Sequence, residues 1–301
     1  MTIAMVNREY YYELDARGVL SLDGIVQDDP WFVDFFFRRL APTANPDYPE
    51  YPFVSRCGEE MNYLRVSDTP IVYTGLRDGR LEYAHSLSTA FAADRLAYSA
   101  DGVLYHWAPV GDRGRLAPHV AVEVARNIQP WGPYYAYSVP DSPFLTPLMP
   151  LALMEDLQII RPKPDNHCIG CGQANPNSLR LSFVRSRQDR IVRTWIRPDE
   201  RMQGAMGTAH GGMISLLLDE AMGKTLSAAG IRAPTARLQV DFRRPMIIGR
   251  EYEVRAWISS QQGRKQFVNA EVRSADDQSL IAEAEALFLQ LRSGAESVQA
   301  G

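Results

Sequence analysis

The sequence predicts an α+β fold in two parts: a strand-rich α+β N-terminal domain, and a C-terminal domain in which an antiparallel sheet wraps one long central helix. Residues 210–230, HGGMISLLLDEAMGKTLSAAG, form a mostly apolar run that ends at a glycine, as an enclosed helix does. The runs at residues 235–242, 251–260 and 265–274 then alternate apolar and polar side chains, as strands do. Residues 130–164 contain eight of the 20 prolines and separate the two parts.

The N-terminal part begins with two local signals. The turn residues Asp15 to Gly18 lie between two β-prone runs, which predicts a hairpin. In DPWFVDFFFRRL, Asp29 can cap a helix and Pro30 suits its first position. Short β-like runs such as YPFVSRCGEEMNYLRV and GVLYHW follow. We therefore expect an α+β domain dominated by strands over residues 1–138.

The proline-rich stretch fixes the expected boundaries of the domains. We assign residues 139–164 to a linker, in which LALMEDLQII could form a short helix, and residues 165–292 to the second domain. The run at residues 279–291 fits either a helix, by its Ala, Glu and Leu content, or a strand, by the alternation of its alanines. Residues 293–301 are expected to be disordered.

The charge of the chain is unevenly divided. Residues 1–160 have 12 arginines, no lysine and 21 acids, a net charge of −9, whereas residues 161–301 have 20 basic and 15 acidic residues, a net charge of +5. A basic domain favours an anionic ligand. The second half has no Lys/Arg cluster, and its net charge of +5 is small for a nucleic-acid-binding domain. We therefore do not expect nucleic-acid binding. No signal peptide, membrane span or disulfide framework is apparent in the sequence, so we expect a cytoplasmic protein.

The start and the middle of the long helix contain the residues suited to catalysis. Gly211 and Gly212 let the backbone approach a ligand closely, and the first N–H groups of a helix can stabilise an oxyanion. Asp219 lies mid-helix among leucines, where a carboxylate costs several kcal/mol unless it is paired or opens onto a cavity. Alternatively, the carboxylate forms a salt bridge with Arg237 or Arg243.

The spacing of His210 and Asp219 predicts a homodimer. Nine residues at about 100° each place the two side chains on opposite sides of one helix, about 13 Å apart along its axis. They cannot meet within one chain. If both act in one site, that site combines the helix start of one subunit with the helix middle of another.

The second half of the chain resembles a known family. The stretch CIGCGQANPNSLRLSF, GTAHGGMISLLLDEAMG, TARLQVDFRRPMIIG and GRKQFVNAEVRSADDQSLIAEAEALF, over about residues 166–291, resembles the hotdog-fold thioesterases. It is most similar to the PaaI-like branch of the 4-hydroxybenzoyl-CoA thioesterase superfamily, in motif order and in the spacing from HGG to Asp219. The resemblance implies an acyl-CoA thioesterase.

The same resemblance implies roles for individual residues. Asp219 would be the nucleophile or the base that activates water, the Gly211 N–H would polarise the thioester carbonyl, and His210 would position the thioester or support the helix start. Thr235 matches a position that helps to hold the water. Relatives often have an Asn where this chain has Gly204, and Gln203 is the candidate substitute.

For the CoA phosphates we expect cations at strand edges and turns, where the family meets the nucleotide. The candidates are Arg243, Arg244, Arg264 and Lys265, with Gly212 as a further substrate-binding residue. For Glu220, the second acid of the helix, we favour a salt bridge. Cys168 and Cys171 form a single CxxC hook, whereas a structural zinc site uses four ligands, so we expect no metal and no cofactor beyond the CoA of the substrate.

Residues 8–137 resemble an uncharacterised family of unknown function, which brings no activity with it. The sequence therefore predicts metal-independent, Asp219-dependent hydrolysis of acyl-CoA in a homodimer or a dimer of dimers. The alternative is a non-catalytic acyl-CoA sensor with the N-terminal domain as effector. The acyl chain, and CoA versus acyl carrier protein as its carrier, stay open.

Overall fold

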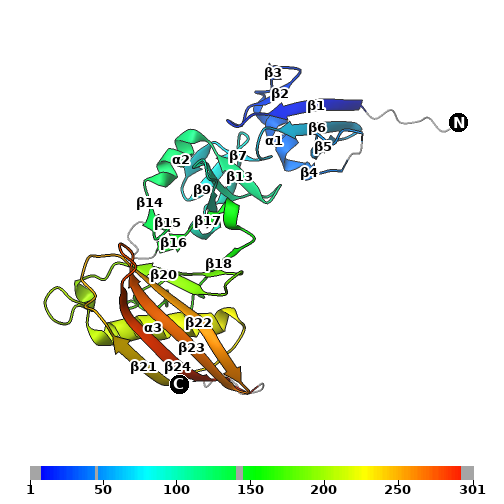
Figure 1. Cartoon of the computed structure of the whole chain (residues 1–301). Coiled ribbons are helices and arrows are strands. Elements are labelled where there is room, and N and C mark those ends of the chain that lie inside the picture. Colours follow the sequence, from blue (N-terminus) through cyan, green and yellow to red (C-terminus); the bar gives the residue numbers. More distant parts are fainter. Residues whose placement is uncertain (1–7, 45–46, 140–144, 293–301) are drawn as a thin grey trace. The chain divides into compact units, whose positions relative to one another are not determined.

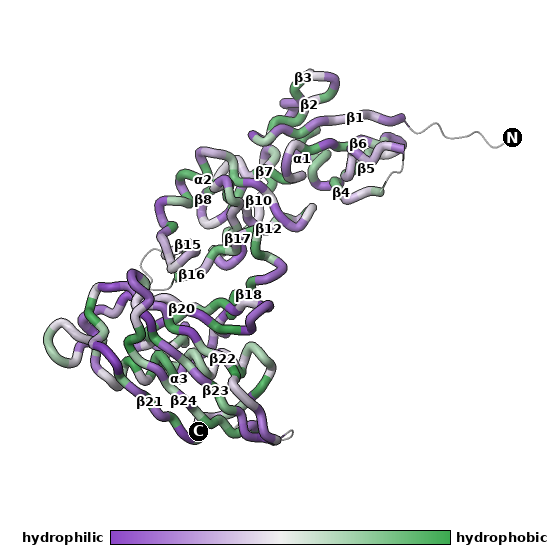
Figure 2. Tube along the Cα trace, in the orientation of Figure 1, coloured by the Kyte–Doolittle hydropathy of each residue, from purple (hydrophilic) through white to green (hydrophobic). Residues whose placement is uncertain are grey.

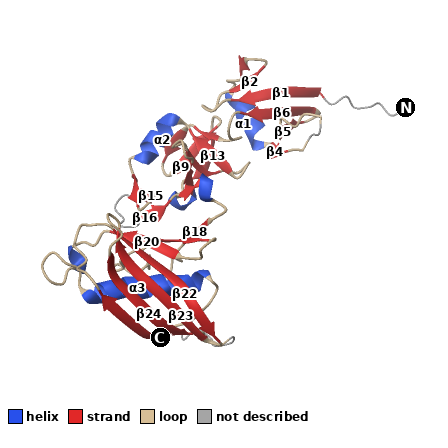
Figure 3. Cartoon of the chain, in the orientation of Figure 1, coloured by secondary structure: helices blue, strands red, loops and turns tan. Residues whose placement is uncertain are grey.

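The computed structural model describes residues 8–44, 47–139 and 145–292 (Figure 1). Its chain divides into two compact units: residues 1–128 with 148–152, and residues 129–147 with 153–301. Strands predominate in both units (Figure 3). In the described part of the chain, no helix has both the length and the apolar character needed to cross a membrane.

The first unit contains a sheet with the strand order β3-β2-β1-β6-β5-β4. Helix α1 (Pro30–Arg38) starts as predicted, because the Asp29 side chain accepts a hydrogen bond from the Phe32 N–H at 2.8 Å. The predicted hairpin is confirmed, since β1 pairs with β2 across the Asp15–Gly18 turn. The strands of this sheet are β1 (Arg8–Leu14), β2 (Leu20–Leu22), β3 (Ile25–Val26), β4 (Leu40–Pro42), β5 (Phe53–Cys57) and β6 (Glu60–Val66).

Two smaller sheets and helix α2 (Pro118–Ala125) complete the first unit. One sheet has the order β10-β9-β8, and the other has the order β17-β11-β12-β13-β7. Their strands are β7 (Val72–Tyr73), β8 (Gly75–Arg77), β9 (Arg80–Tyr83), β10 (Leu87–Ala90), β11 (Leu96–Tyr98), β12 (Leu104–Trp107), β13 (Arg113–Leu116) and β17 (Met149–Pro150).

The second unit is built on a sheet with the order β18-β19-β20-β22-β23-β24-β21, all of whose neighbouring strands are antiparallel. Helix α3 (Gly211–Ala228) lies across this sheet (Figure 3). The strands are β18 (Leu157–Ile160), β19 (Phe183–Ser186), β20 (Val192–Ile196), β21 (Thr235–Phe242), β22 (Tyr252–Gln262), β23 (Lys265–Ser274) and β24 (Leu280–Leu289).

The core of the second unit lies between α3 and the sheet. Hydrophilic and hydrophobic residues alternate along β22, β23 and β24 (Figure 2), and the apolar side chains of one face are buried. The expected enclosure of the helix is confirmed at Leu217, Leu218, Ala221 and Met222, which are fully buried. Leu216 is only partly buried.

The run at residues 279–291 forms strand β24, so the alternation of its alanines outweighs its helix-favouring composition. Ala282, Ala284 and Ala286 are buried against the core, and β24 is paired on both sides, with β23 and β21. Tertiary context overrides intrinsic propensity in such a strand, because each alternate side chain fits beneath the helix.

Residues 139–164 are not a plain linker. Within their described part they form β16 (Leu145–Pro147), β17, a short 3-10 helix (Leu151–Leu153) and β18, so the helix considered for LALMEDLQII is wrong for most of its length. Prolines are tolerated in strands at sheet edges, where no N–H is needed, and both β16 and β17 are edge strands. The expected disordered tail lies outside the described residues.

The segment before the linker packs with the second unit, although we assigned it to the N-terminal domain. Strands β14 (Ile128–Trp131) and β15 (Tyr134–Ser138) form a small sheet with β16. The ring of Trp131 lies edge-on to that of Trp195 at 5.1 Å, and its Nε1 donates to the Trp195 carbonyl at 3.2 Å. A Cβ at Gly132 would lie 2.2 Å from the Trp195 ring, so only glycine fits there.

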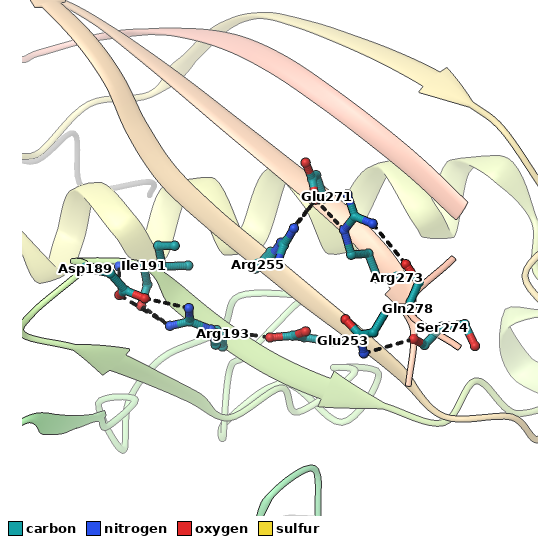
Figure 4. Close-up of polar contacts among 9 residues, drawn as sticks. All are labelled: Asp189, Ile191, Arg193, Glu253, Arg255, Glu271, Arg273, Ser274 and Gln278. Atoms are coloured by element: carbon teal, nitrogen blue, oxygen red, sulfur yellow. Dashed lines mark hydrogen bonds and ion pairs between the residues drawn. The ribbon is translucent and has the colours of Figure 1, made fainter. Parts of the chain in front are cut away.

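One surface of the large sheet has a network of charges (Figure 4). Glu271 accepts hydrogen bonds from Arg255 Nη2 and Arg273 Nε, both at 2.7 Å. Burial alone would raise the pKa of Glu271, but the hydrogen bonds from the two arginines outweigh it and hold that pKa below its usual range. The ionised form of this side chain is therefore the stabilising one.

We expect Glu271→Gln to lower the free energy of unfolding by about 1–3 kcal/mol at neutral pH, since it removes charge-assisted hydrogen bonds. Because the folded-state pKa is depressed, this contribution is present above the unfolded-state pKa and is lost as the pH falls through the folded one. Urea unfolding at neutral pH and well below the ordinary pKa of 4.5 measures both values. Glu285→Gln, an exposed glutamate on β24, is the matched control. An equal loss at both pH values would contradict the assignment.

Candidate active site

The Asp219 carboxylate is held by Thr235. The Thr235 hydroxyl donates to Asp219 Oδ1 at 2.8 Å, which joins the middle of α3 to the first residue of β21. Asp219 is partly exposed and Thr235 is exposed, so this carboxylate opens to the surface although its helix is otherwise mostly enclosed. Arg243, which we considered as its salt-bridge partner, pairs with Glu283 at 2.7 Å instead.

The start of α3 is shaped by His210, which is the N-cap residue. Its Nδ1 accepts a hydrogen bond from the Gly212 N–H at 2.9 Å. This bond uses the Gly212 N–H, whereas the Gly211 N–H, as the first of the helix, has no acceptor within the helix. Around Gly211 the nearest side chain is Phe242, whose ring would lie 3.4 Å from an added Cβ. A Cβ at Gly211 would thus be in ordinary van der Waals contact with that ring.

These two groups lie at opposite ends of β21. Asp219 contacts Thr235, where the strand begins, and Gly211 lies beside Phe242, where it ends. The helix and strand thus run antiparallel to each other. Within one chain the carboxylate and the helix start are not brought together, which agrees with the separation that their spacing predicts.

The loop before the helix leaves little space for a side chain at residue 204, where the resemblance led us to expect an asparagine. A Cβ at Gly204 would lie 2.9 Å from the His210 Cα. The neighbouring Gln203 folds back on its own loop, where its Oε1 accepts from the Gly207 N–H at 3.1 Å. The Gln203 oxygen is thus occupied within the loop.

The four cations predicted to bind the nucleotide fall into two pairs. Arg243 and Arg244 follow the end of β21, and both backbone N–H groups donate to Ile281 at the start of β24. Lys265 pairs with Leu289 at the other end of β24, and Arg264 Nε donates to the Gln290 carbonyl at 2.8 Å. One chain therefore does not gather all four cations into one nucleotide site, because they lie at opposite ends of the same strands.

A cluster that sequence reasoning missed lies on another side of α3. Cys168 donates to Glu220 Oε2 at 3.1 Å, and Cys171 lies in the same cluster. Glu220 also forms the expected salt bridge, with Lys224 at 3.5 Å. Burial, followed by the Glu220 carboxylate, raises the pKa of Cys171 to about 12, so its thiol is neutral and unsuited to nucleophilic attack. The CxxC spacing was visible in sequence, but its carboxylate partner was not.

Comparisons with known proteins divide the chain in the same way as its sequence does. Residues 206–281 match the family model of the thioesterase superfamily, and residues 3–132 match a domain of unknown function, DUF4505. Both resemblances noted in the sequence are thereby confirmed. The matched thioesterase segment includes Gly211, Asp219 and Thr235.

Curated relatives match over a limited segment. An acyl-coenzyme A thioesterase THEM4 from Bos taurus is 34% identical over 90 residues, which cover 30% of this chain and 37% of that protein. An acyl-coenzyme A thioesterase THEM5 from Mus musculus is 30% identical over 95 residues, which cover 32% of this chain and 38% of that protein. The chain thus spans about two fifths of the length of these relatives.

Solved structures are also similar to part of the chain. A Streptococcus mutans protein bound to acetyl CoA is 18% identical, with a TM-score of 0.32, over 34% of this chain and 81% of that one. The E. coli PaaI protein from the phenylacetic acid degradation operon is 18% identical, with a TM-score of 0.33, over 35% of this chain and 75% of that one.

Proposed function

We propose that this protein hydrolyses acyl-CoA thioesters to a free carboxylic acid and CoA, in a hotdog domain formed by its C-terminal unit. The observation that carries the proposal is the Asp219 carboxylate, partly exposed on an otherwise mostly apolar helix and oriented by the Thr235 hydroxyl. A carboxylate in such a helix costs stability unless it is hydrogen-bonded or solvated, and Asp219 is both. The thioesterase family match over the same residues supports this interpretation.

In the proposed mechanism, Asp219 takes a proton from a water molecule, whose oxygen attacks the thioester carbonyl carbon. The Gly211 N–H donates to the carbonyl oxygen, where negative charge develops, and the helix dipole adds to that stabilisation. The tetrahedral intermediate collapses with cleavage of the C–S bond, and the CoA thiolate leaves and takes up the proton that Asp219 had accepted. Thr235 orients the carboxylate and its water. These steps use no metal or other cofactor.

The proposed site needs a second copy of the chain. Among the described residues, strand β21 ends the sheet and pairs with β24 alone, so its other edge has no partner strand there. Phe242 at the end of β21 is 52% exposed. A strand edge without a partner, with an exposed apolar side chain at its end, is a surface on which another strand can add.

Antiparallel pairing of β21 with β21 of a second copy joins the separated groups. In that pairing the Phe242 end of one strand lies beside the Thr235 end of the other, so the Gly211 of one subunit faces the Asp219 of its partner. In the same arrangement, Arg243 and Arg244 of one copy lie near one end of the partner's sheet. That end of the partner's sheet contains Arg264 and Lys265. Two equivalent sites result, each with cations near it for the CoA phosphates.

Thiol release from a panel of aliphatic and aromatic acyl-CoAs tests the proposal. We expect turnover of at least one acyl class, because the base and the oxyanion donor do not depend on the acyl chain. Acyl-pantetheine substrates, which lack the nucleotide, should show a higher KM if the arginines bind the phosphates. No thiol release from any member of the panel would contradict the enzymatic function.

The second candidate is a non-catalytic acyl-CoA sensor with the N-terminal domain as effector. The contact between Gly204 and His210 favours it, because the asparagine that often completes the site in relatives has no space there. Saturable binding of acyl-CoA without turnover in the same panel distinguishes the sensor from the enzyme.

A further inference from the structure

The cluster formed by Cys168, Cys171 and Glu220 has donor atoms suited to a metal ion. One ligand atom from each residue lies within 4.8 Å of the other two. In a tetrahedral zinc site with Zn–S bonds of about 2.3 Å and Zn–O bonds of about 2.0–2.2 Å, the ligand atoms are about 3.4–3.8 Å apart. Small side-chain adjustments would therefore bring the three donors around one ion.

The loop that presents the two cysteines is a tight turn with N–H donors directed at both sulfurs. Gly170 N–H donates to Cys168 Sγ at 3.3 Å, and Asn166 Nδ2 donates to Cys171 Sγ at 3.2 Å. The Gly172 N–H closes the turn onto the Cys168 carbonyl at 2.8 Å. N–H groups aimed at sulfur stabilise thiolates and fix the orientation of metal ligands.

Two glycines make this arrangement sterically possible. A Cβ at Gly170 would lie 2.7 Å from the Glu220 carboxyl group, and a Cβ at Gly172 would lie 2.5 Å from backbone atoms of Asn166 and Cys168. The loop can therefore lie directly against Glu220 of α3. A side chain at residue 170 would force the Glu220 carboxyl group to shift from its present place beside the sulfurs.

A bound divalent cation would displace the protons of the two thiols and balance the charges that result. Two thiolates and the Glu220 carboxylate would then give three negative charges, and Lys224, which pairs with Glu220 at 3.5 Å, supplies one positive charge. The Cys171 side chain is 2% exposed, and the side chains of Glu220 and Lys224 are 14% and 17% exposed. Solvent therefore screens these charges weakly.

We propose that Cys168, Cys171 and Glu220 bind a zinc-class divalent cation, with water as the fourth ligand. Two sulfurs with one carboxylate suit Zn²⁺ or Co²⁺, whereas Mg²⁺ and Ca²⁺ prefer oxygen alone. This site departs from the metal-free expectation of the sequence, and it is separate from the proposed reaction. The ion would cross-link the loop at residues 166–172 to α3 beside Asp219, where it would hold that part of the helix in place.

The test is a cobalt titration of the full chain, purified without a histidine tag, stripped with a chelator and kept reduced. We expect one equivalent of Co²⁺ to bind, with a thiolate-to-cobalt charge-transfer band and the intense visible bands of tetrahedral coordination, and Zn²⁺ to displace it. Metal analysis of the unstripped protein should find zinc. A titration without the charge-transfer band, or formation of a Cys168–Cys171 disulfide with no saturable metal uptake, overturns the proposal.

Three variants separate this site from adventitious binding. Cys168→Ser should lose the charge-transfer band or reduce it with weaker binding, and Glu220→Gln should keep the band but bind at least about tenfold more weakly. Cys57→Ser, which removes the cysteine of the first unit, should bind as the unmodified protein does. Circular dichroism of each stripped variant reports whether it is folded. Unchanged cobalt binding in folded Cys168→Ser would also overturn the proposal, whatever the outcome of the acyl-CoA assays.

Discussion

Replacing Asp219 by asparagine is expected to reduce the kcat of acyl-CoA hydrolysis by about 10²–10⁴-fold, because the amide cannot accept the proton of the attacking water. Asparagine keeps the size of the side chain and can still accept the hydrogen bond from Thr235. The KM should therefore change little. Steady-state thiol release with the best substrate of the panel measures both constants.

Two further variants make this test specific. Asp241→Asn removes a carboxylate from an exposed residue of β21 and should leave kcat unchanged. Thr235→Val keeps the shape of the side chain but loses the hydroxyl that holds Asp219, so we expect a smaller loss of kcat than for Asp219→Asn. Equal rates for Asp219→Asn and the unmodified enzyme would remove Asp219 from the mechanism.

Introducing proline at Val240 is expected to dissociate the proposed dimer and to abolish most of the activity. The Arg243 N–H donates to Ile281 of β24 at 2.8 Å. Because backbone N–H groups alternate along a strand, those of Asp241 and Gln239 also point toward β24, and that of Val240 points to the free edge. Proline at residue 240 therefore keeps the pairing with β24 but removes a donor that a partner strand would use.

Sedimentation velocity and thiol release on the same samples test the dimer. Val240→Ala, which keeps the N–H, is the control and should stay dimeric and active. Val240→Pro should sediment as a monomer, with a loss of activity comparable to that of Asp219→Asn, because neither subunit has a complete site. A Val240→Pro monomer with full activity would contradict the shared site.

Much of the second unit could be predicted from sequence because its signals are local. The helix from Gly211 to Ala228 follows from a mostly apolar run that ends at a glycine, and the strand from Thr235 to Phe242 follows from the alternation of apolar and polar residues. The run that became β24 could not be decided in this way. Its composition favours a helix, and only burial beneath α3 makes the alternating strand the stable form.

In the candidate site, too, the local features could be predicted from sequence and the tertiary contacts could not. The sequence placed His210 and Asp219 on opposite sides of one helix, since that follows from helix geometry alone. It could not predict that His210 caps the helix with its own ring nitrogen, or that Gly204 packs against the His210 backbone. Those contacts depend on how the preceding loop folds back.

By itself the sequence determined the long enclosed helix, the strands that follow it, the likeness to thioesterases and the nine-residue separation of His210 and Asp219. Only the tertiary structure decided which distant side chains meet: Thr235 with Asp219, Glu220 with the two cysteines, and Trp131 with Trp195. The physical reason is that periodicity and capping act over a few neighbouring residues, whereas these contacts join segments that approach each other only when the core packs.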